Sequence, residues 1–226
     1  MATSFGEPKL KAFPWRPRSD RLAGLMQTCL FILAVNWCLQ GVRGMDGKEL
    51  SFRLGLEALV AALIAGALLD PLGAPSAVAL GLLVAHSLNF TLNGQLWVCA
   101  RYCRRYRGDA QALDAFLGET ARALARLPWL REAACIGSLG RTGAGPRSDL
   151  DLRLLFPPGP LAWLRVNLLL LRLRSLALVR RIPLDLYAYA TPERLRRFDQ
   201  REPLLLLLDR DGRLAALFPR RAVPWR

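Results

Sequence analysis

The sequence has few of the side chains that bind soft metal ions or form disulfide frameworks. It contains a single histidine, His86, five cysteines and no Cys-x-x-Cys pair. Zinc sites need clustered Cys and His ligands, and small disulfide scaffolds need an even set of Cys, so the composition argues against both. We therefore expect no disulfide framework and a reducing, cytoplasm-facing environment.

Acidic residues are also scarce, with 18 Asp and Glu against 32 Lys and Arg, and the formal net charge is +14. Nearly every basic residue is Arg, a preference that a GC-rich genome would also produce. A surplus of this kind suits an anionic partner such as lipid headgroups, the phosphates of a nucleotide or nucleic acid. The Arg residues are scattered without interleaved aromatic side chains, which argues against nucleic acid.

Long uncharged runs, by contrast, fill the first half of the chain. Residues 22–42 contain no formal charge, residues 54–69 contain only Glu57, and residues 76–98 are again uncharged. About 20 apolar residues in a helix cross a bilayer. The Pro- and Gly-containing turn at 70–75 predicts that the second and third runs form a helical hairpin. We expect residues 1–107 to form an all-α membrane module of two to three transmembrane helices.

The distribution of Lys and Arg predicts how this module is oriented. The hairpin turn carries neither residue, whereas four arginines follow the third run: Arg101, Arg104, Arg105 and Arg107. The turn is therefore predicted outside and the chain after Arg101 in the cytoplasm, at the inner membrane. Basic residues also precede the first run and favour a cytoplasmic N-terminus, which three full spans do not allow. Either the first run is re-entrant or interfacial, or the N-terminus lies outside.

Three polar residues, His86, Asn89 and Asn93, recur at helical spacing in the third run and share one face. Polar groups at membrane depth are costly and often functional. One interpretation is that they hold the bundle together through hydrogen bonds to polar residues of the first run, namely Gln27, Asn36 and Gln40. The other is that they line a polar groove for the head of a lipid-linked substrate.

The second half of the chain, residues 108–226, alternates helical and strand patterns around the stretch "CIGSLGRTGAGPRSDLDLRLLF" at 135–156. Alternation in "DLDLRLLF" predicts a strand that presents Asp149 and Asp151 on one face. Two neighbouring carboxylates repel each other unless a cation lies between them, and Mg²⁺ binds through carboxylate and phosphate oxygens. A glycine-rich turn lets backbone N–H groups approach phosphates. The stretch therefore predicts a site for a nucleoside triphosphate and its metal ions.

The residues "GSLGRTGAGPRSDLDL" at 137–152 resemble the signature of the DNA polymerase β-like nucleotidyltransferase superfamily, in its minimal nucleotidyltransferase type. The resemblance covers roughly residues 111–189. It implies an α+β fold, a mixed sheet with flanking helices, here preceded by the membrane module. The family carries a third carboxylate on a later strand, for which Asp185 in "RRIPLDLYAYA" is the candidate.

The resemblance also implies residue roles. Asp149 and Asp151 would bind two Mg²⁺ ions, and Asp185 would ligate one of them and help to deprotonate an acceptor hydroxyl. The phosphates of the nucleoside triphosphate would be bound by the glycine-rich turn, through Gly137, Ser138 and Arg141.

The predicted function is that of a membrane-anchored nucleotidyltransferase. It would transfer a nucleoside monophosphate to an unknown hydroxyl acceptor, for which a lipid- or glycan-linked molecule is one option. The alternatives are a catalytically inactive nucleotide-binding or membrane assembly protein, and a membrane protein that binds nucleic acid.

Two further elements follow from local patterns. Residues 161–181 are apolar but contain Arg165, Arg172 and Arg174, so we expect a helix that covers the sheet rather than a membrane span. The stretch "PLLLLLDRDGRLAALF" at 203–218 predicts two strands joined by an Asp-Arg-Asp-Gly turn.

Overall fold

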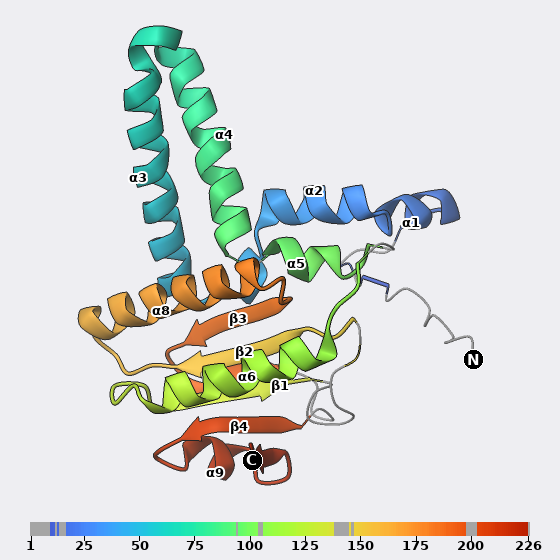
Figure 1. Ribbon diagram of the computed structural model, residues 1–226, viewed down its shortest axis with the longest axis vertical. Coiled ribbons are helices and arrows are strands. Elements are labelled where there is room, and N and C mark those ends of the chain that lie inside the picture. The colour runs from blue at the N-terminus through green and yellow to red at the C-terminus, as the bar shows by residue number, and fades with distance from the viewer. Residues whose placement is uncertain are drawn as a thin grey trace.

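The computed structural model describes residues 10–11, 13, 17–93, 95–103, 106–137, 145, 147–197 and 203–225. A helical part formed by the first half of the chain stands on an α/β part formed by the second half (Figure 1). The domain boundary expected near residue 107 falls between two helices. These are α5 (Gln95–Ala100), the last helix of the first part, and α6 (Ala110–Ala125), the first helix of the second.

Five strands form one mixed sheet in the order β3-β2-β1-β4-β5. Their bounds are Glu132–Ile136 (β1), Leu150–Leu155 (β2), Leu184–Tyr189 (β3), Leu204–Asp209 (β4) and Ala222–Pro224 (β5). The pairs β2–β3 and β4–β5 are parallel, and β1 is antiparallel to both of its neighbours. The predicted α+β class with a mixed sheet and flanking helices is confirmed.

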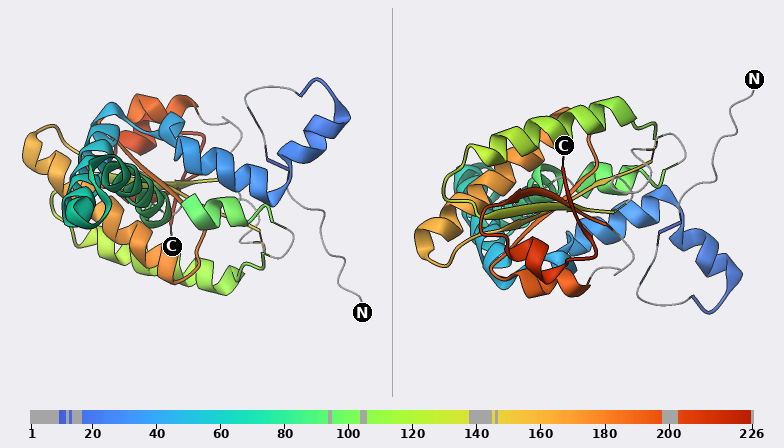
Figure 2. Two further views of the ribbon diagram at one scale, coloured as in Figure 1. Left: turned by 90° about the horizontal axis from the view of Figure 1, so that it is seen from above. Right: turned by 90° about the horizontal axis from the view of Figure 1, so that it is seen from below.

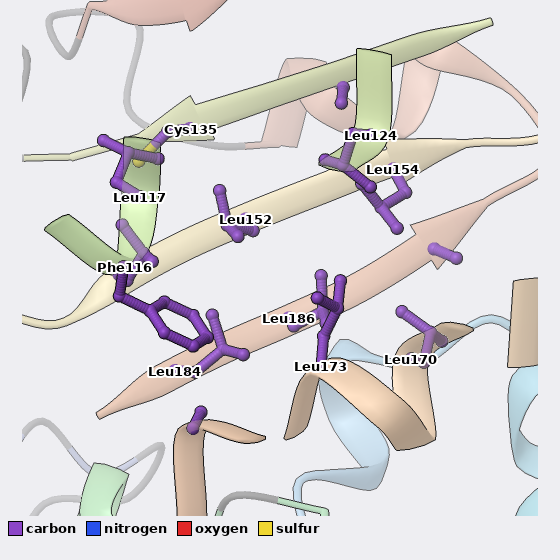
Figure 3. Packing of buried hydrophobic residues seen from close by; sticks show 14 of the residues in the cluster. Phe116, Leu117, Leu124, Cys135, Leu152, Leu154, Leu170, Leu173, Leu184 and Leu186 are labelled. Carbon is purple, nitrogen blue, oxygen red and sulfur yellow. The ribbon is translucent and has the colours of Figure 1, made fainter. Parts of the chain in front are cut away.

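Helices α6 (Ala110–Ala125) and α8 (Pro160–Val179) cover one face of this sheet. Alternate residues of the strands point into the layer between them, as Leu152, Leu154 and Leu186 do in Figure 3. α8 is therefore the sheet-covering helix that its arginines predicted. The opposite positions of β2 and β3 carry Asp151, Arg153 and Asp185, together with Leu155, Tyr187 and Tyr189, which belong to a second buried apolar cluster.

Short helices cover this second face: the 3-10 helix η2 (Pro192–Arg197) and α9 (Arg213–Leu217), which lie below the sheet in the right-hand view of Figure 2. The prediction of a second strand after residue 209 is wrong, because α9 occupies that place. The Asp209 carboxylate accepts hydrogen bonds from the amides of Leu214, at 3.2 Å, and Ala215, at 2.9 Å. A carboxylate on free amides stabilises the start of a helix, which the hairpin pattern concealed.

Two long helices, α3 (Gly47–Leu72) and α4 (Ala74–Leu92), form the predicted hairpin. Both are long and apolar enough to cross a membrane. Of the apolar 18-residue segment in each helix, only 11% in α3 and 22% in α4 is buried. α3 begins earlier than the apolar run because the Asp46 side chain accepts a hydrogen bond from the Lys48 amide. The third run does not stay helical to residue 98: α4 ends at Leu92, and a separate short helix, α5 (Gln95–Ala100), follows.

The first apolar run forms two helices, α1 (Asp20–Met26) and α2 (Cys29–Leu39), which meet at 68°. The Thr28 hydroxyl begins α2 by accepting a hydrogen bond from the Phe31 amide. α2 extends sideways from the foot of the hairpin (Figure 1), and the short 3-10 helix η1 (Val42–Gly44) leads from it to α3. The first run is thus not one straight span.

Hydrogen bonds attach α2 to the polar face of α4. The indole N–H of Trp37 donates to Ser87 Oγ at 3.2 Å, and the Gln40 amide donates to the His86 carbonyl at 2.8 Å. His86 itself lies 2.8 Å from Glu57 Oε1 of α3, and Asn89 donates to the same carboxylate. These contacts support the interpretation in which polar residues hold the bundle together. Of the three partners expected from the first run, Gln40 alone bonds to this face, while Gln27 and Asn36 bond to Lys11.

A disulfide joins Cys29 at the start of α2 to Cys103 just after α5, with 5.0 Å between the Cα atoms. The expectation of no disulfide is therefore wrong for this pair. The two residues are 74 positions apart in sequence. They meet because the two helices of the hairpin lead the chain out and back to the same end. No local spacing in the sequence indicates that the two cysteines are close.

A buried polar cluster attaches the foot of the hairpin to β3. Arg174 of α8 contacts Glu49 Oε1 of α3 at 2.7 Å, and the same carboxylate oxygen pairs with Arg53 at 2.8 Å. Arg174 also donates to Asn93 at the end of α4 and to the Leu186 carbonyl of β3. Each of the three charged side chains is 5% exposed or less. Buried charges need this degree of pairing, so the cluster fixes the hairpin relative to the sheet.

Candidate functional site

The three predicted carboxylates meet at one end of the two parallel strands. Asp151 of β2 lies directly opposite Asp185 of β3 in the register of the parallel pair. Asp149 precedes β2 by one residue and shares the face of Asp151, since side chains alternate along a strand. The side chains of Asp151 and Asp185 remain 27% and 23% exposed, so solvent and small ligands reach them.

Gly137 lies beside this cluster, directly after β1. The last residue of β1, Ile136, is the antiparallel partner of Asp151. Gly137 has a φ of +111°, and a Cβ atom added there would lie 3.2 Å from Asp151 Oδ2. Glycine is therefore required both for the backbone conformation and for the close approach to the carboxylate. The other two predicted phosphate-binding residues, Ser138 and Arg141, lie outside the described residues.

Two arginines that the motif does not include bind the carboxylates. Arg153, two residues after Asp151, places Nη2 2.9 Å from Asp185 Oδ2 and 3.9 Å from Asp151 Oδ1. It also donates to the Asp185 carbonyl at 2.5 Å, and its guanidinium lies over the Tyr187 ring. Arg101, which follows α5, pairs with Asp149 Oδ1. Both guanidinium groups are buried, so they hold the carboxylates in fixed places.

The surroundings give the two facing carboxylates different proton affinities. Burial raises the pKa of Asp151, and the negative charges of Asp149 and Asp185 raise it further. Burial acts in the same direction on Asp185, but Arg153 and a hydrogen bond from Asp151 outweigh it and lower the pKa of Asp185. Of the two facing carboxyls, Asp151 therefore takes up a proton more readily than Asp185, and a hydrogen bond joins their side chains. A cation bound between them would compete with such a proton.

Asp149, Asp151 and Asp185 offer carboxylate oxygens, the type of ligand that hard divalent cations prefer. Within the described residues, however, no group of three His, Cys, Asp or Glu side chains is arranged to hold a metal ion. The physical reason lies in Arg101 and Arg153, which occupy carboxylate oxygens that a cation would use. A metal ion would have to draw at least one carboxylate away from its arginine.

Sequence reasoning missed both arginines, for different reasons. Arg153 continues the alternation of Asp149 and Asp151, so the sequence pattern already predicted its position on the same strand face. Arg101 lies far from the motif in sequence and looked like part of a basic flank that orients the hairpin. Comparisons of the chain with protein-family models, with curated proteins and with solved structures give no match.

Proposed function

We propose that the protein is a membrane-anchored nucleotidyltransferase that transfers a nucleoside monophosphate to a hydroxyl group. The observation that carries the proposal is the register of β2 and β3, which sets Asp151 against Asp185 on the face that Asp149 shares. The close approach of Gly137 to Asp151 adds a second support. Together with the motif at 137–152, these features match what nucleotidyl transfer requires: metal-binding oxygens next to a turn that accepts phosphates.

In the proposed reaction, an acceptor oxygen forms a bond to the α-phosphorus of the triphosphate. The bond between that phosphorus and the bridging oxygen to the β-phosphate breaks, and pyrophosphate leaves. The hydroxyl proton passes to Asp185, the carboxylate that Arg153 keeps ionised. Two Mg²⁺ ions held by Asp149, Asp151 and Asp185 would supply charge stabilisation for the attacking and leaving oxygens. Gly137, Ser138 and Arg141 would bind the departing phosphates.

The pairing of the carboxylates with Arg101 and Arg153 favours one alternative, a nucleotide-binding protein without catalytic activity. The two functions differ in turnover. Purified protein would be incubated with each triphosphate, labelled at the α-phosphate, together with Mg²⁺ and a membrane extract. Label transferred to an acceptor supports the enzyme. Triphosphate that binds but is never consumed supports the alternative.

The nucleotide supply fixes the orientation that the proposal requires. Triphosphates are available in the cytoplasm, so the carboxylates have to face it, as the arginines after α4 also predict. Lys11 bonds to Gln27 after α1 and to Asn36 of α2, and α2 ends at the foot of the hairpin, which favours an N-terminal segment on the same side. In this reducing compartment Cys29 and Cys103 would exist as two thiols and form their bond on oxidation.

This orientation predicts the outcome of thiol labelling in intact cells. Single cysteines at Ser76, near the hairpin tip, and at Ala216, on α9, would be introduced into a cysteine-free background. Both positions are exposed. A membrane-impermeant thiol reagent should label the first and not the second, because only the tip lies outside. A third cysteine at Ser19 should stay unlabelled if the hairpin alone crosses the membrane. Label at Ala216 without label at Ser76 would contradict the orientation.

A further inference from the structure

Beside the carboxylates lies a second group of side chains that neither the motif nor the proposed chemistry uses. It consists of Lys11, Arg101 and Tyr102, here called the Lys11 cluster. The Lys11 amine lies 5.4 Å from the centre of the Tyr102 ring, and the guanidinium carbon of Arg101 lies 4.9 Å from the same centre. Arg101 also donates to the Tyr102 hydroxyl at 3.0 Å. Two cations thus converge on one aromatic ring.

Lys11 is held in this place by specific contacts. Gln27 bonds to both backbone groups of Lys11, accepting from its amide at 2.9 Å and donating to its carbonyl at 3.0 Å. The Lys11 ammonium donates to Asn36 Oδ1 at 2.9 Å. Burial lowers the pKa of Lys11, and the nearby charge of Asp185 acts in the opposite direction. The chain therefore positions an ammonium group close to the carboxylates.

The Lys11 cluster has hydrogen-bonding capacity to spare. An ammonium group has three donors, of which Asn36 takes one, and among the described residues no carboxylate forms an ion pair with Lys11. The Nε atom of Arg101 is buried and has no hydrogen-bond partner in the described part of the chain. Buried donors of this kind carry a desolvation cost unless a ligand satisfies them. A bound anion is the kind of ligand that supplies the missing acceptor oxygens.

The Lys11 cluster is placed by elements next to β3, whereas Gly137 follows β1, the other neighbour of β2. Helix α5, which directly precedes Arg101 and Tyr102, contacts both β3 and α2. Lys11 would therefore meet an anion that approaches between α2 and the β3 side of the sheet.

This side of the site faces the membrane module. α2 extends sideways from the hairpin foot, alongside α5 (Figures 1 and 2), and exposes apolar side chains such as Leu30 and Leu39. Its one strongly polar side chain in this region, Asn36, turns instead to Lys11. A helix with exposed apolar residues at the foot of a membrane hairpin suits the headgroup level of a bilayer. The Lys11 amine thus lies between this level and the carboxylates.

We propose that Lys11, Arg101 and Tyr102 bind a phosphate group of the acceptor, which enters from the side of α2. The identification of the bound molecule as the acceptor rests on the proposed nucleotidyl transfer, but the anion site itself does not depend on it. The ligand chemistry is a phosphate monoester or a diphosphate with at least one full negative charge. Such a group is carried both by membrane lipids and by soluble phosphorylated compounds.

Binding is tested by calorimetric titration of the purified full-length protein in detergent, without nucleotide or Mg²⁺. The probes are dihexanoyl phosphatidic acid, inorganic phosphate and, as a zwitterionic control, dihexanoyl phosphatidylcholine. Wild type is compared with Lys11→Gln, Lys11→Arg and the matched control Lys48→Gln, since Lys48 is exposed at the start of α3. Lys11→Gln should weaken phosphatidic acid binding at least about tenfold, because a charge-assisted hydrogen bond is lost. Lys11→Arg and Lys48→Gln should bind like wild type.

Each outcome has a defined meaning. Tighter binding of phosphatidic acid than of inorganic phosphate supports the site with a lipid as the source, and equal binding supports it with a soluble phosphate compound. Equal affinities of wild type and Lys11→Gln, with unchanged thermal unfolding, would overturn the proposal. So would equal binding of phosphatidylcholine. Because the titration contains no nucleotide, its failure is separate from a failure to observe nucleotidyl transfer.

Discussion

Asp151→Asn is expected to lower nucleotidyl transfer at least about a thousandfold while the protein still inserts and folds. The variant removes one charged oxygen donor, a loss of several kcal/mol of charge stabilisation in the transition state, and each 1.36 kcal/mol corresponds to a tenfold change in rate. Its fold should persist because the Asn amide can donate to Asp185, which keeps a hydrogen bond between the two side chains. Turnover is measured as label transferred per minute at saturating triphosphate.

Asp151 is a sharper choice than its two neighbours. Asp149→Asn would remove the carboxylate that pairs with the buried Arg101, and Asp185→Asn would remove the closer of the two carboxylates that pair with Arg153. A loss of activity in either variant would not distinguish a loss of catalysis from a loss of folding stability. Asp114→Asn is the matched control, because Asp114 is an exposed aspartate on α6. Full activity of Asp151→Asn alongside an active Asp114→Asn would remove Asp151 from the mechanism.

Glu49→Ala should lower the free energy of unfolding by about 3–5 kcal/mol, the usual effect of leaving a buried charge unpaired. The variant would deprive Arg53 and Arg174 of their shared carboxylate, and all three side chains are almost fully buried. Glu119→Ala is the control, since its ion pair with Arg180 is about half exposed and should contribute less than about 1 kcal/mol. Denaturant unfolding in detergent measures both.

The Glu49 experiment also tests how the two parts of the chain are joined. If the hairpin only anchors the α/β part, Glu49→Ala should behave like Glu119→Ala. If the buried cluster fixes the hairpin against β3, the variant should also loosen the contact of Tyr189 with Gly44, where the hydroxyl donates to the carbonyl at 3.1 Å. Equal stability of the two variants would contradict the structural role assigned to the cluster.

The site could be predicted from the sequence where its residues follow a local period. Asp149 and Asp151 alternate within one strand, and Asp185 lies in a second apolar run of the same kind, so their common face was predictable. The parallel register that sets Asp151 against Asp185 depends on the crossover through α8, which no local pattern specifies. Arg101 joins the site only because the hairpin returns the chain to its foot.

The fold shows the same division. The hairpin and α8 were predictable because run length and buried charge decide between membrane and core helices. The two helices of the first run were not predictable. The conflict between its basic flank and three full spans left two options, a re-entrant or interfacial first run or an N-terminus outside. The Asp209 carboxylate favours α9 over the predicted strand, and a three-dimensional return of the chain brings Cys29 to Cys103. The disulfide thus depends on a long-range contact, whereas α9 depends on a capping side chain five to six residues away.

The position of the transferred label tests nucleotidyl transfer most directly. The preferred triphosphate would be supplied in two forms, labelled at the α-phosphate or at the γ-phosphate, with Mg²⁺, membrane extract and wild-type protein or Asp151→Asn. The account predicts that the α-label appears on the acceptor and the γ-label in pyrophosphate, with wild type only. Transfer of the γ-label to the acceptor, or the same α-label transfer by Asp151→Asn, would contradict it.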